Sequence, residues 1–486
     1  SLDLKLILIM KLLLSILLFS FSVQLTAQKN QYELTIEVPG IKDSVGYLAY
    51  YHGKGQYYRD TAKVGKNGKI VFTSTTDSLE HGMYSFVLGN MKIFDFIVDG
   101  QKFSLKTDTA EVVTKMVVKG SPENKIFYEY MSFLGVRQDE LKKLSKELQN
   151  ANDSKKLKIE ARQKELDEEV KAYIKLLHEN HSGTLTSNFI KALSVPQVPE
   201  PPKNEDGSID SSFSFRYYKN HFFDDLDFTD QRLLRTSVYH EKIMTYLNKL
   251  TYQIPDSIIK SVDVVLKNAI KNDELFKYTL NNLTSKYERS EQMGIDAVFV
   301  HLAKNYYMKG MADEWFSKEQ LKKLSERANA LEPLLIGKKA PNIVVKDTAQ
   351  KKFLQLYEVE SPFTIVYIWS PDCGHCKIST PELKKVYDEY KSKGVEVFGV
   401  NNEFENKDWI KFINKHQLDW INGSDGGDYR SNFRTLYDVY STPQTYVLDK
   451  DKKIIAKKIP IESLGNVLDF YIKQAEKDKL KAIDEK

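Results

Sequence analysis

The only two cysteines of the 486-residue chain are Cys373 and Cys376. They follow a continuous apolar run, Phe363 to Trp369, and stand where a helical pattern begins. A cysteine at a helix N-terminus lies near unpaired backbone N–H groups and the positive end of the helix dipole, and both favour a thiolate. Because the thiolate is the reactive form of cysteine, this placement predicts a site of thiol chemistry.

The two thiols have different predicted roles. Cys373, at the helix start, is the expected nucleophile, and a protonated His375 would favour its anion further. Cys376, one helical turn later, is placed to attack a mixed disulfide at Cys373 and to release the reduced partner. Gly374 leaves the loop between them sterically open. Cys373 and Cys376 are the predicted catalytic residues, acting through a redox-active disulfide with no other cofactor.

Other uses of a C-x-x-C pair fit the local sequence less well. A c-type haem site requires histidine directly after the second cysteine, where Lys377 stands. A structural zinc site would have to recruit His416 and one further ligand, so no metal is predicted. A peroxidase reaction that uses Cys373 alone remains an alternative.

The elements around the cysteines alternate between strand and helix patterns. Helical patterns cover Cys376 to Tyr390, Trp409 to His416, Phe433 to Tyr437 and Leu464 to Ala475, and strand patterns cover Ile343 to Val345, Phe363 to Trp369, Val395 to Val400, Gln444 to Leu448 and Lys453 to Ala456. This order predicts an α/β sheet covered by helices.

This C-terminal part resembles the thioredoxin-fold domains of the envelope type represented by TlpA and ResA, which are related to the peroxiredoxin-like superfamily. The matching motifs are Gly337 to Asn342, Trp369-x-x-x-Cys373-x-x-Cys376, Pro381 and Ser441-Thr442-Pro443. The resemblance implies a thioredoxin fold and thiol–disulfide exchange. It also implies a cis Pro443 loop facing the dithiol, in which the backbone at Thr442 pairs with an extended substrate. It assigns substrate binding or positioning to Trp369, Gly374, His375, Thr442 and Pro443.

Two positions depart from the related families. Thioredoxin keeps a buried acid six positions before its first cysteine, and that position is Tyr367 here. ResA-type proteins keep a glutamate three positions after the second cysteine, where this chain has Ser379. The proton acceptor for Cys376 is therefore left open among Glu382, His375 and water. The Gly-His dipeptide matches protein disulfide isomerase and favours a less strongly reducing couple than that of thioredoxin.

The preceding residues predict two further domains. Short alternating or apolar segments separated by turn residues predict a β-rich antiparallel sandwich or barrel at 28–120. The period then changes to 3.6 and predicts a helical domain at 121–332, which begins with a helical hairpin turning near Asn152. The thioredoxin-like domain would occupy 333–486. Both earlier domains resemble the N-terminal domains of multidomain exported thioredoxin-like proteins of the Bacteroidota.

The first residues match the pattern of an export signal. Lys11 precedes an almost wholly apolar run from Leu12 to Val23, and Leu25-Thr26-Ala27 places a small residue at the cleavage site, so 1–27 is the predicted signal peptide and cleavage is expected after Ala27. The predicted location is the periplasm or cell envelope. Contact with a membrane is expected only if the signal stays uncleaved.

The composition limits the possible partners. The 71 basic and 67 acidic residues are interspersed, so no basic tract predicts nucleic-acid binding. Protein or small-molecule thiols and disulfides are the expected substrates, and the redox donor or acceptor stays open. Another hypothesis remains: an envelope binding or chaperone-like protein in which the dithiol is secondary.

Overall fold

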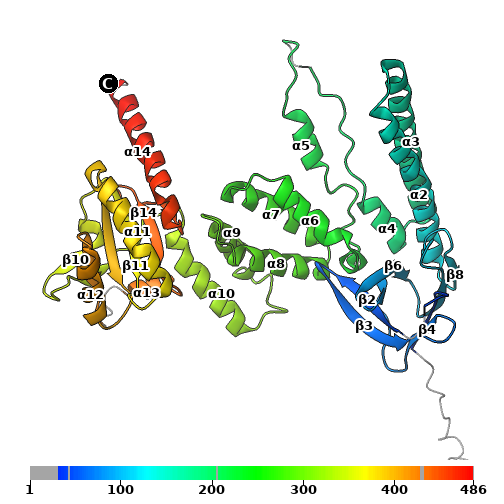
Figure 1. Ribbon diagram of the computed structural model, residues 1–486, viewed down its shortest axis with the longest axis horizontal. Coiled ribbons are helices and arrows are strands. Elements are labelled where there is room, and N and C mark those ends of the chain that lie inside the picture. Colours follow the sequence, from blue (N-terminus) through cyan, green and yellow to red (C-terminus); the bar gives the residue numbers. More distant parts are fainter. Residues whose placement is uncertain (1–30, 42–43, 204–205, 427–431, 485–486) are drawn as a thin grey trace, which may run out of the picture. The chain divides into compact units, whose positions relative to one another are not determined.

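The computed structural model describes residues 31–41, 44–203, 206–426 and 432–484 (Figure 1). The expected signal peptide, residues 1–27, lies outside them. Contacts divide the chain into two compact units, Ser1–Tyr246 and Leu247–Lys486. None of the helices in the described ranges is both long and apolar enough to span a bilayer.

The first unit begins with a β-sandwich of two four-stranded sheets. One sheet has the order β4-β1-β7-β8 and the other the order β3-β2-β5-β6. Alternating apolar side chains such as Leu34, Phe72 and Phe86 point inward and form one core between the sheets. The strands are β1 (Tyr32–Glu37), β2 (Val45–His52), β3 (Gly55–Lys63), β4 (Lys69–Ser74), β5 (Gly82–Leu88), β6 (Met91–Val98), β7 (Lys102–Lys106) and β8 (Val117–Lys119).

The expectation of purely antiparallel pairing is wrong for one pair of strands. β1 and β7 run parallel, with Glu33 opposite Lys102 and Glu37 opposite Lys106. Parallel neighbours need a long crossover connection, and here the chain from β2 to β6 provides it. The turn signals between consecutive strands could not reveal this long-range pairing.

Helices complete the first unit. The hairpin of α2 and α3 is confirmed, and its two helices run antiparallel, because Phe133 stacks on Tyr173 at 4.0 Å while Glu140 pairs with Arg162 at 2.8 Å. Asn152 begins α3 by accepting a hydrogen bond from the backbone N–H of Lys155 at 3.0 Å. The helices are α2 (Pro122–Leu148), α3 (Asp153–Asn180), α4 (Leu185–Ala192), α5 (Phe213–Asn220), η1 (Gln231–Arg235) and α6 (Val238–Lys249), the last of which runs past Tyr246.

The second unit opens with further helices. Side-chain caps begin two of them, Asn272 for α8 and a Ser317–Gln320 capping box for α10. Pro255 occupies the first turn of α7, where no backbone N–H is required. The elements are α7 (Pro255–Ala269), α8 (Asp273–Glu288), α9 (Asp296–Leu302), η2 (Ala303–Tyr307), α10 (Lys318–Leu331) and η3 (Glu332–Leu334).

The rest of the second unit is a seven-stranded mixed sheet of order β10-β9-β13-β12-β11-β14-β15. All seven residues of β11 are buried, as expected for a strand covered on both faces. The strands are β9 (Val344–Lys346), β10 (Phe353–Gln355), β11 (Phe363–Trp369), β12 (Val395–Asn401), β13 (Ile421–Ser424), β14 (Gln444–Leu448) and β15 (Ile454–Lys457). The helices are η4 (Leu356–Glu358), α11 (Gly374–Tyr390), η5 (Lys391–Lys393), α12 (Lys407–His416), α13 (Phe433–Leu436) and α14 (Ile461–Asp484).

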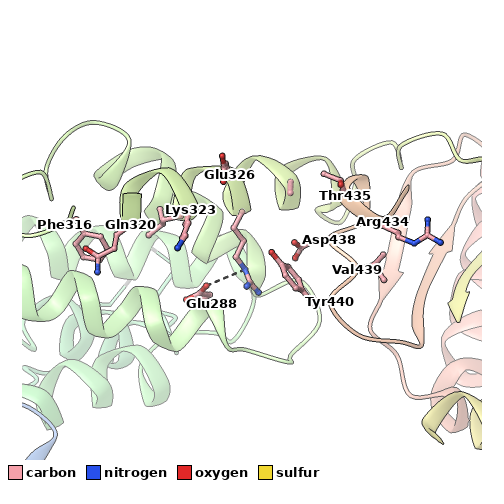
Figure 2. Close-up of a pocket in the computed structure, with 13 residues that line it drawn as sticks. Glu288, Phe316, Gln320, Lys323, Glu326, Arg434, Thr435, Asp438, Val439 and Tyr440 are labelled. Atoms are coloured by element: carbon pink, nitrogen blue, oxygen red, sulfur yellow. Dashed lines mark ion pairs between the residues drawn. The ribbon is translucent and has the colours of Figure 1, made fainter. Parts of the chain in front are cut away.

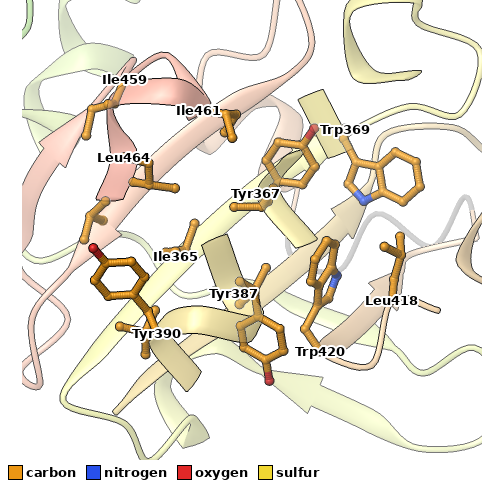
Figure 3. Packing of buried hydrophobic residues seen from close by; sticks show 14 of the residues in the cluster. Ile365, Tyr367, Trp369, Tyr387, Tyr390, Leu418, Trp420, Ile459, Ile461 and Leu464 are labelled. Carbon is orange, nitrogen blue, oxygen red and sulfur yellow. The ribbon is translucent and has the colours of Figure 1, made fainter. Parts of the chain in front are cut away.

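Two hydrophobic clusters cover the two faces of this sheet. On one face Ile365, Tyr367 and Trp369 pack with Tyr387 and Leu464 (Figure 3). On the other face the alternate residues of β11 pack with β12, α13 and the residues before β9. The predicted order of a β-rich domain, a central helical region and a C-terminal α/β sheet is confirmed. The exact domain boundaries stay predictions.

Candidate active site

The dithiol lies where the central strand of the sheet leads into a helix. β11 ends at Trp369, and Cys373 is the N-cap residue of α11. Ser370 shapes the turn between them, since its carbonyl accepts the N–H of Cys373 at 3.3 Å and its hydroxyl accepts the N–H of Asp372 at 3.1 Å. Both cysteines are free thiols; Cys373 is partly exposed and Cys376 is fully buried.

A loop preceding β14 faces the first thiol. The Cys373 thiol donates to the carbonyl oxygen of Thr442 at 3.1 Å. The bond between Thr442 and Pro443 is cis, as predicted. This proximity follows from strand pairing, because β14 runs antiparallel to β11 and its first residue, Gln444, lies opposite Ile368.

Opposing effects act on the pKa of Cys373, and the net result is a pKa below the usual value. Partial burial raises it, but hydrogen bonds from the Thr442 side chain, from the backbone N–H and thiol of Cys376, and from the backbone N–H of His375 outweigh burial. The Thr442 carbonyl accepts only from the protonated thiol, so that contact favours the neutral form. The donors dominate because they gather at a helix N-terminus.

Cys376 has the opposite character. Burial is the main cause that raises its pKa to about 12, and the hydrogen bond that it donates to Cys373 raises it further. The same hydrogen bond lowers the pKa of Cys373. The Cys373 thiol therefore ionises readily. The Cys376 thiol keeps its proton as long as Cys373 beside it is a thiolate.

Hydroxyl groups stand where the related families keep acids. The Tyr367 hydroxyl is 2.8 Å from the Thr380 hydroxyl and 3.2 Å from that of Ser379. Ser379 also donates to the carbonyl of His375 at 2.8 Å. The two departures from the family pattern, Tyr367 and Ser379, thus contact each other. Both cysteine charges raise the pKa of Tyr367, although burial is the larger cause.

Thr380 is the member of this hydroxyl group that the sequence analysis missed. It is fully buried and lies four residues after Cys376, on the same face of α11. Its i+4 spacing from a buried cysteine was the available signal. Glu382, one of the open candidates for a proton acceptor, pairs instead with Lys385 at 2.8 Å on the partly exposed side of the helix.

The other predicted positioning residues surround the dithiol in different ways. Trp369 is fully buried against Tyr367 and Phe412, at 6.2 and 5.2 Å between ring centroids, at the end of the strand that leads to the dithiol. Gly374 and His375 are exposed at the start of α11. A Cβ at Gly374 would meet nothing within 4 Å, consistent with an open loop. Within the described residues, no group of three or more His, Cys, Asp or Glu side chains is arranged to hold a metal ion.

Three family models match successive parts of the chain. The AhpC/TSA family matches residues 336–457, which contain the dithiol and the Pro443 loop. Two domains of unknown function precede it, DUF4369 at residues 32–127 and DUF5106 at residues 178–332. The first of these covers the β-sandwich, and the second covers helices from both compact units.

Curated proteins and solved structures also resemble parts of the chain. The thiol-disulfide oxidoreductase ResA of Bacillus thuringiensis (strain Al Hakam) is 29% identical over 143 residues, which are 29% of this chain and 80% of that protein. A domain of a possible thiol-disulfide isomerase from Cytophaga hutchinsonii is 39% identical, covering 30% of this chain and 99% of that one, with a TM-score of 0.28. A thioredoxin-like protein from Bacteroides caccae is 18% identical, covering 57% of this chain and 98% of that one, with a TM-score of 0.46.

The sheet, the paired thiols and these matches define a multidomain thioredoxin-like protein. Residues 336–457 match the AhpC/TSA family, and the enzyme class of the protein is that of the thiol-disulfide oxidoreductases.

Proposed function

We propose that this protein is an exported oxidoreductase that exchanges disulfides with protein or small-thiol substrates through Cys373 and Cys376. The observation that carries the proposal is the asymmetry of the two thiols. Cys373 is partly exposed with a lowered pKa, whereas Cys376 is buried with a pKa raised to about 12. A nucleophile and a resolving thiol require this difference.

In the reducing direction the exchange takes two steps. The Cys373 thiolate attacks one sulfur of a substrate disulfide; a mixed disulfide forms, and the other substrate sulfur leaves as a thiolate that takes up a proton. Cys373 then no longer carries the charge that opposes ionisation of Cys376. Cys376 loses its proton and attacks Cys373, the second substrate thiol leaves, and the enzyme disulfide forms. In the oxidising direction the same steps run in reverse.

The Thr442–Pro443 loop is the proposed docking element. The Thr442 carbonyl lies 3.1 Å from the Cys373 sulfur, so a substrate strand that pairs with this backbone brings its own sulfur next to the nucleophile. Export is supported by the signal pattern at residues 11–27. The proposed location is the periplasm or cell envelope, and the donor or acceptor that resets the dithiol is a further thiol–disulfide couple.

Reduction of insulin disulfides by the full chain, with dithiothreitol as the reductant, tests the proposal. Cys373→Ser should abolish the catalysed rate. Cys376→Ser, reduced and freed of dithiothreitol before insulin is added, should accumulate a mixed disulfide visible on a non-reducing gel. An unchanged rate for Cys373→Ser would exclude the proposed nucleophile. Turnover of hydrogen peroxide without insulin reduction would favour the peroxidase, and neither activity would favour a binding protein.

A further inference from the structure

A cavity of about 810 Å³ lies within the second unit, between α10 and the segment that leads to the Pro443 loop (Figure 2). From the helical side it is lined by residues such as Phe316, Leu324 and Arg327. From the other side it is lined by Asp438, Val439 and Tyr440. Its volume is in the range of pockets that bind ligands, about 300–1,000 Å³.

A short backbone segment, from Tyr440 to Thr442, connects the cavity with the dithiol. Tyr440 lies at its rim, and Thr442, two residues later, places its carbonyl 3.1 Å from the Cys373 sulfur. Two residues of extended chain span at most about 7 Å. A polypeptide whose cysteine sits at Cys373 advances about 3.3 Å per residue, so its second to fourth neighbour reaches the cavity.

Opposite charges balance around the cavity. Three acidic and three basic residues line it: Glu288, Glu326, Asp438, Lys323, Arg327 and Arg434. Arg327 lies 3.6 Å from Glu288 and 5.3 Å from the centre of the Tyr440 ring, and Lys323 lies 2.7 Å from Glu319. This balance disfavours a phosphate-bearing or metal ligand, because neither sign of charge is in excess.

The lining nonetheless offers specific contacts to a peptide. Phe316, Leu324 and Val439 provide partly buried apolar surface. The pKa of the Asp438 carboxyl is raised, because burial outweighs the attraction of Arg327 and Lys458. A donor from a peptide, either a backbone N–H or a lysine side chain, would compensate this carboxylate. Apolar surface with a few polar groups is typical of sites that bind peptides.

Buried contacts join the helices of the second unit to the sheet that carries the dithiol. The Lys457 ammonium on β15 forms an ion pair with Asp296 at the start of α9 and donates to the Leu334 carbonyl at 2.6 Å. The N–H of Gly337 also donates to the Ile454 carbonyl at 2.7 Å. The segment after α10 is therefore bonded to β15, a strand of the sheet that carries the dithiol.

We propose that this cavity binds the residues flanking the reactive cysteine of an extended client polypeptide, with an apolar side chain against α10 and a basic or N–H donor at Asp438. The proposal rests on the proposed function, because it takes the client's cysteine to lie at Cys373. It extends the recognition surface from the thioredoxin-like domain to the helical region. Small disulfides, whose flanks are too short to reach it, do not use the cavity.

Binding of a non-reactive peptide tests the cavity without thiol chemistry. The probe is a capped nonapeptide with a central serine in place of cysteine and with leucine and lysine in both flanks. Two shortened forms each lack one flank. We expect one of the two truncations to weaken binding to the full chain at least about fivefold, measured by calorimetry, because only one flank points toward the cavity.

Matched substitutions test whether the cavity causes this difference in affinity between the full and the shortened peptide. Ala330→Trp fills the cavity and should remove the fivefold advantage, whereas Asn329→Trp, at the neighbouring exposed position outside the lining, should keep it. Tyr440→Ala removes a rim side chain that is 78% exposed, so it should fold normally and weaken the peptide. Tyr252→Ala, 73% exposed and outside the lining, is its control.

The outcomes separate this proposal from the proposed function. Equal affinity for the full and both shortened peptides, or full binding by both Ala330→Trp and Tyr440→Ala, would overturn the cavity proposal even if insulin is reduced. If Ala330→Trp proves unfolded by circular dichroism, Tyr440→Ala decides. Turnover of a small disulfide, oxidised glutathione, should be unchanged in Tyr440→Ala; absence of turnover in the unmodified protein would count against the proposed function alone.

Discussion

The β-sandwich and the C-terminal sheet both carry polar side chains among buried strands, but they use them differently. In the sandwich, Asp95 on β6 accepts hydrogen bonds from Ser85 on β5, from Lys92 at 2.8 Å and from Tyr51 at 3.4 Å. Gln56 on β3 donates to Ser85 at 2.7 Å, so the polar groups satisfy one another. At the end of β11, by contrast, Cys373 is partly exposed, and its thiol lies 3.1 Å from the Thr442 carbonyl oxygen while hydrogen-bond donors at the start of α11 lower its pKa.

The contrast separates a structural polar cluster from a reactive one. A closed network of donors and acceptors stabilises the strands that it joins and leaves nothing for a ligand to complete. After β11, the partly exposed Cys373 thiol has a lowered pKa, and the buried Cys376 thiol has a raised pKa. Changes in the sandwich should therefore alter stability alone, and changes near β11 should alter reactivity.

The largest expected effect is a difference in alkylation between the two thiols. At pH 7 a pKa of about 12 leaves roughly one Cys376 in 10⁵ as thiolate. Cys373, whose pKa lies below its usual value, is at least about one part in 100 thiolate. Iodoacetamide labelling of the reduced protein, followed by mass spectrometry, should modify Cys373 at least about 10³-fold faster.

The pH dependence of this labelling has a definite sign. Since the thiolate reacts, the Cys373 rate should fall about tenfold per pH unit below its pKa and level off above it. Labelling in urea is the control, because both cysteines then return to ordinary pKa values and should react alike. Similar rates for the two thiols in the folded protein would contradict the asymmetry.

The second expected effect concerns the sandwich. Asp95→Ala removes the acceptor for the fully buried Ser85 hydroxyl and should lower the free energy of unfolding by about 1–3 kcal/mol, measured by urea denaturation. Asp77→Ala, in an exposed pair 3.5 Å from Arg59, should change it by less than about 1 kcal/mol. Both variants should keep the insulin-reduction rate. A large loss of rate in Asp95→Ala would mean that the sandwich takes part in the chemistry.

The sequence predicted the elements whose signal is local. The apolar run of β11 and the position of the cysteines before α11 were sufficient to locate the dithiol, and the Ser-Thr-Pro motif located the loop facing it. Strand β3 (Gly55–Lys63) carries no such local signal, because most of its side chains are exposed and show no alternation. Strand β13 was missed because its Asn422-Gly423 pair is typical of a turn. Gly423 is there for packing, since a Cβ would lie 2.3 Å from Val345.

The parts of the site that depend on distant contacts could not be predicted. Tyr367 and Ser379 were recognised only as departures from a family pattern, and their contact depends on how α11 packs on β11. The cavity beside Tyr440 depends on Arg327 and Glu288, more than 100 residues earlier in the chain. No periodicity or motif predicts a contact between residues so far apart in the sequence, because such a contact depends on how separate elements pack.

The smallest expected effect tests the hydroxyl groups that replace the missing acid. Tyr367→Phe removes the hydroxyl between Ser379 and Thr380. Burial and, to a smaller extent, the charge of Cys376 raise the pKa of Tyr367, so the substitution tests whether this neighbouring hydroxyl helps Cys376 to ionise. The second step of exchange should slow about three- to tenfold while attack by Cys373 keeps its rate, as measured by quenched-flow trapping of the mixed disulfide. Tyr387→Phe is the matched control, because Tyr387 is buried in the same cluster but donates to Glu396 at 3.0 Å (Figure 3). If both variants slow the second step equally, packing explains the loss; if neither does, Cys376 gives its proton to water or to the leaving sulfur without help from Tyr367.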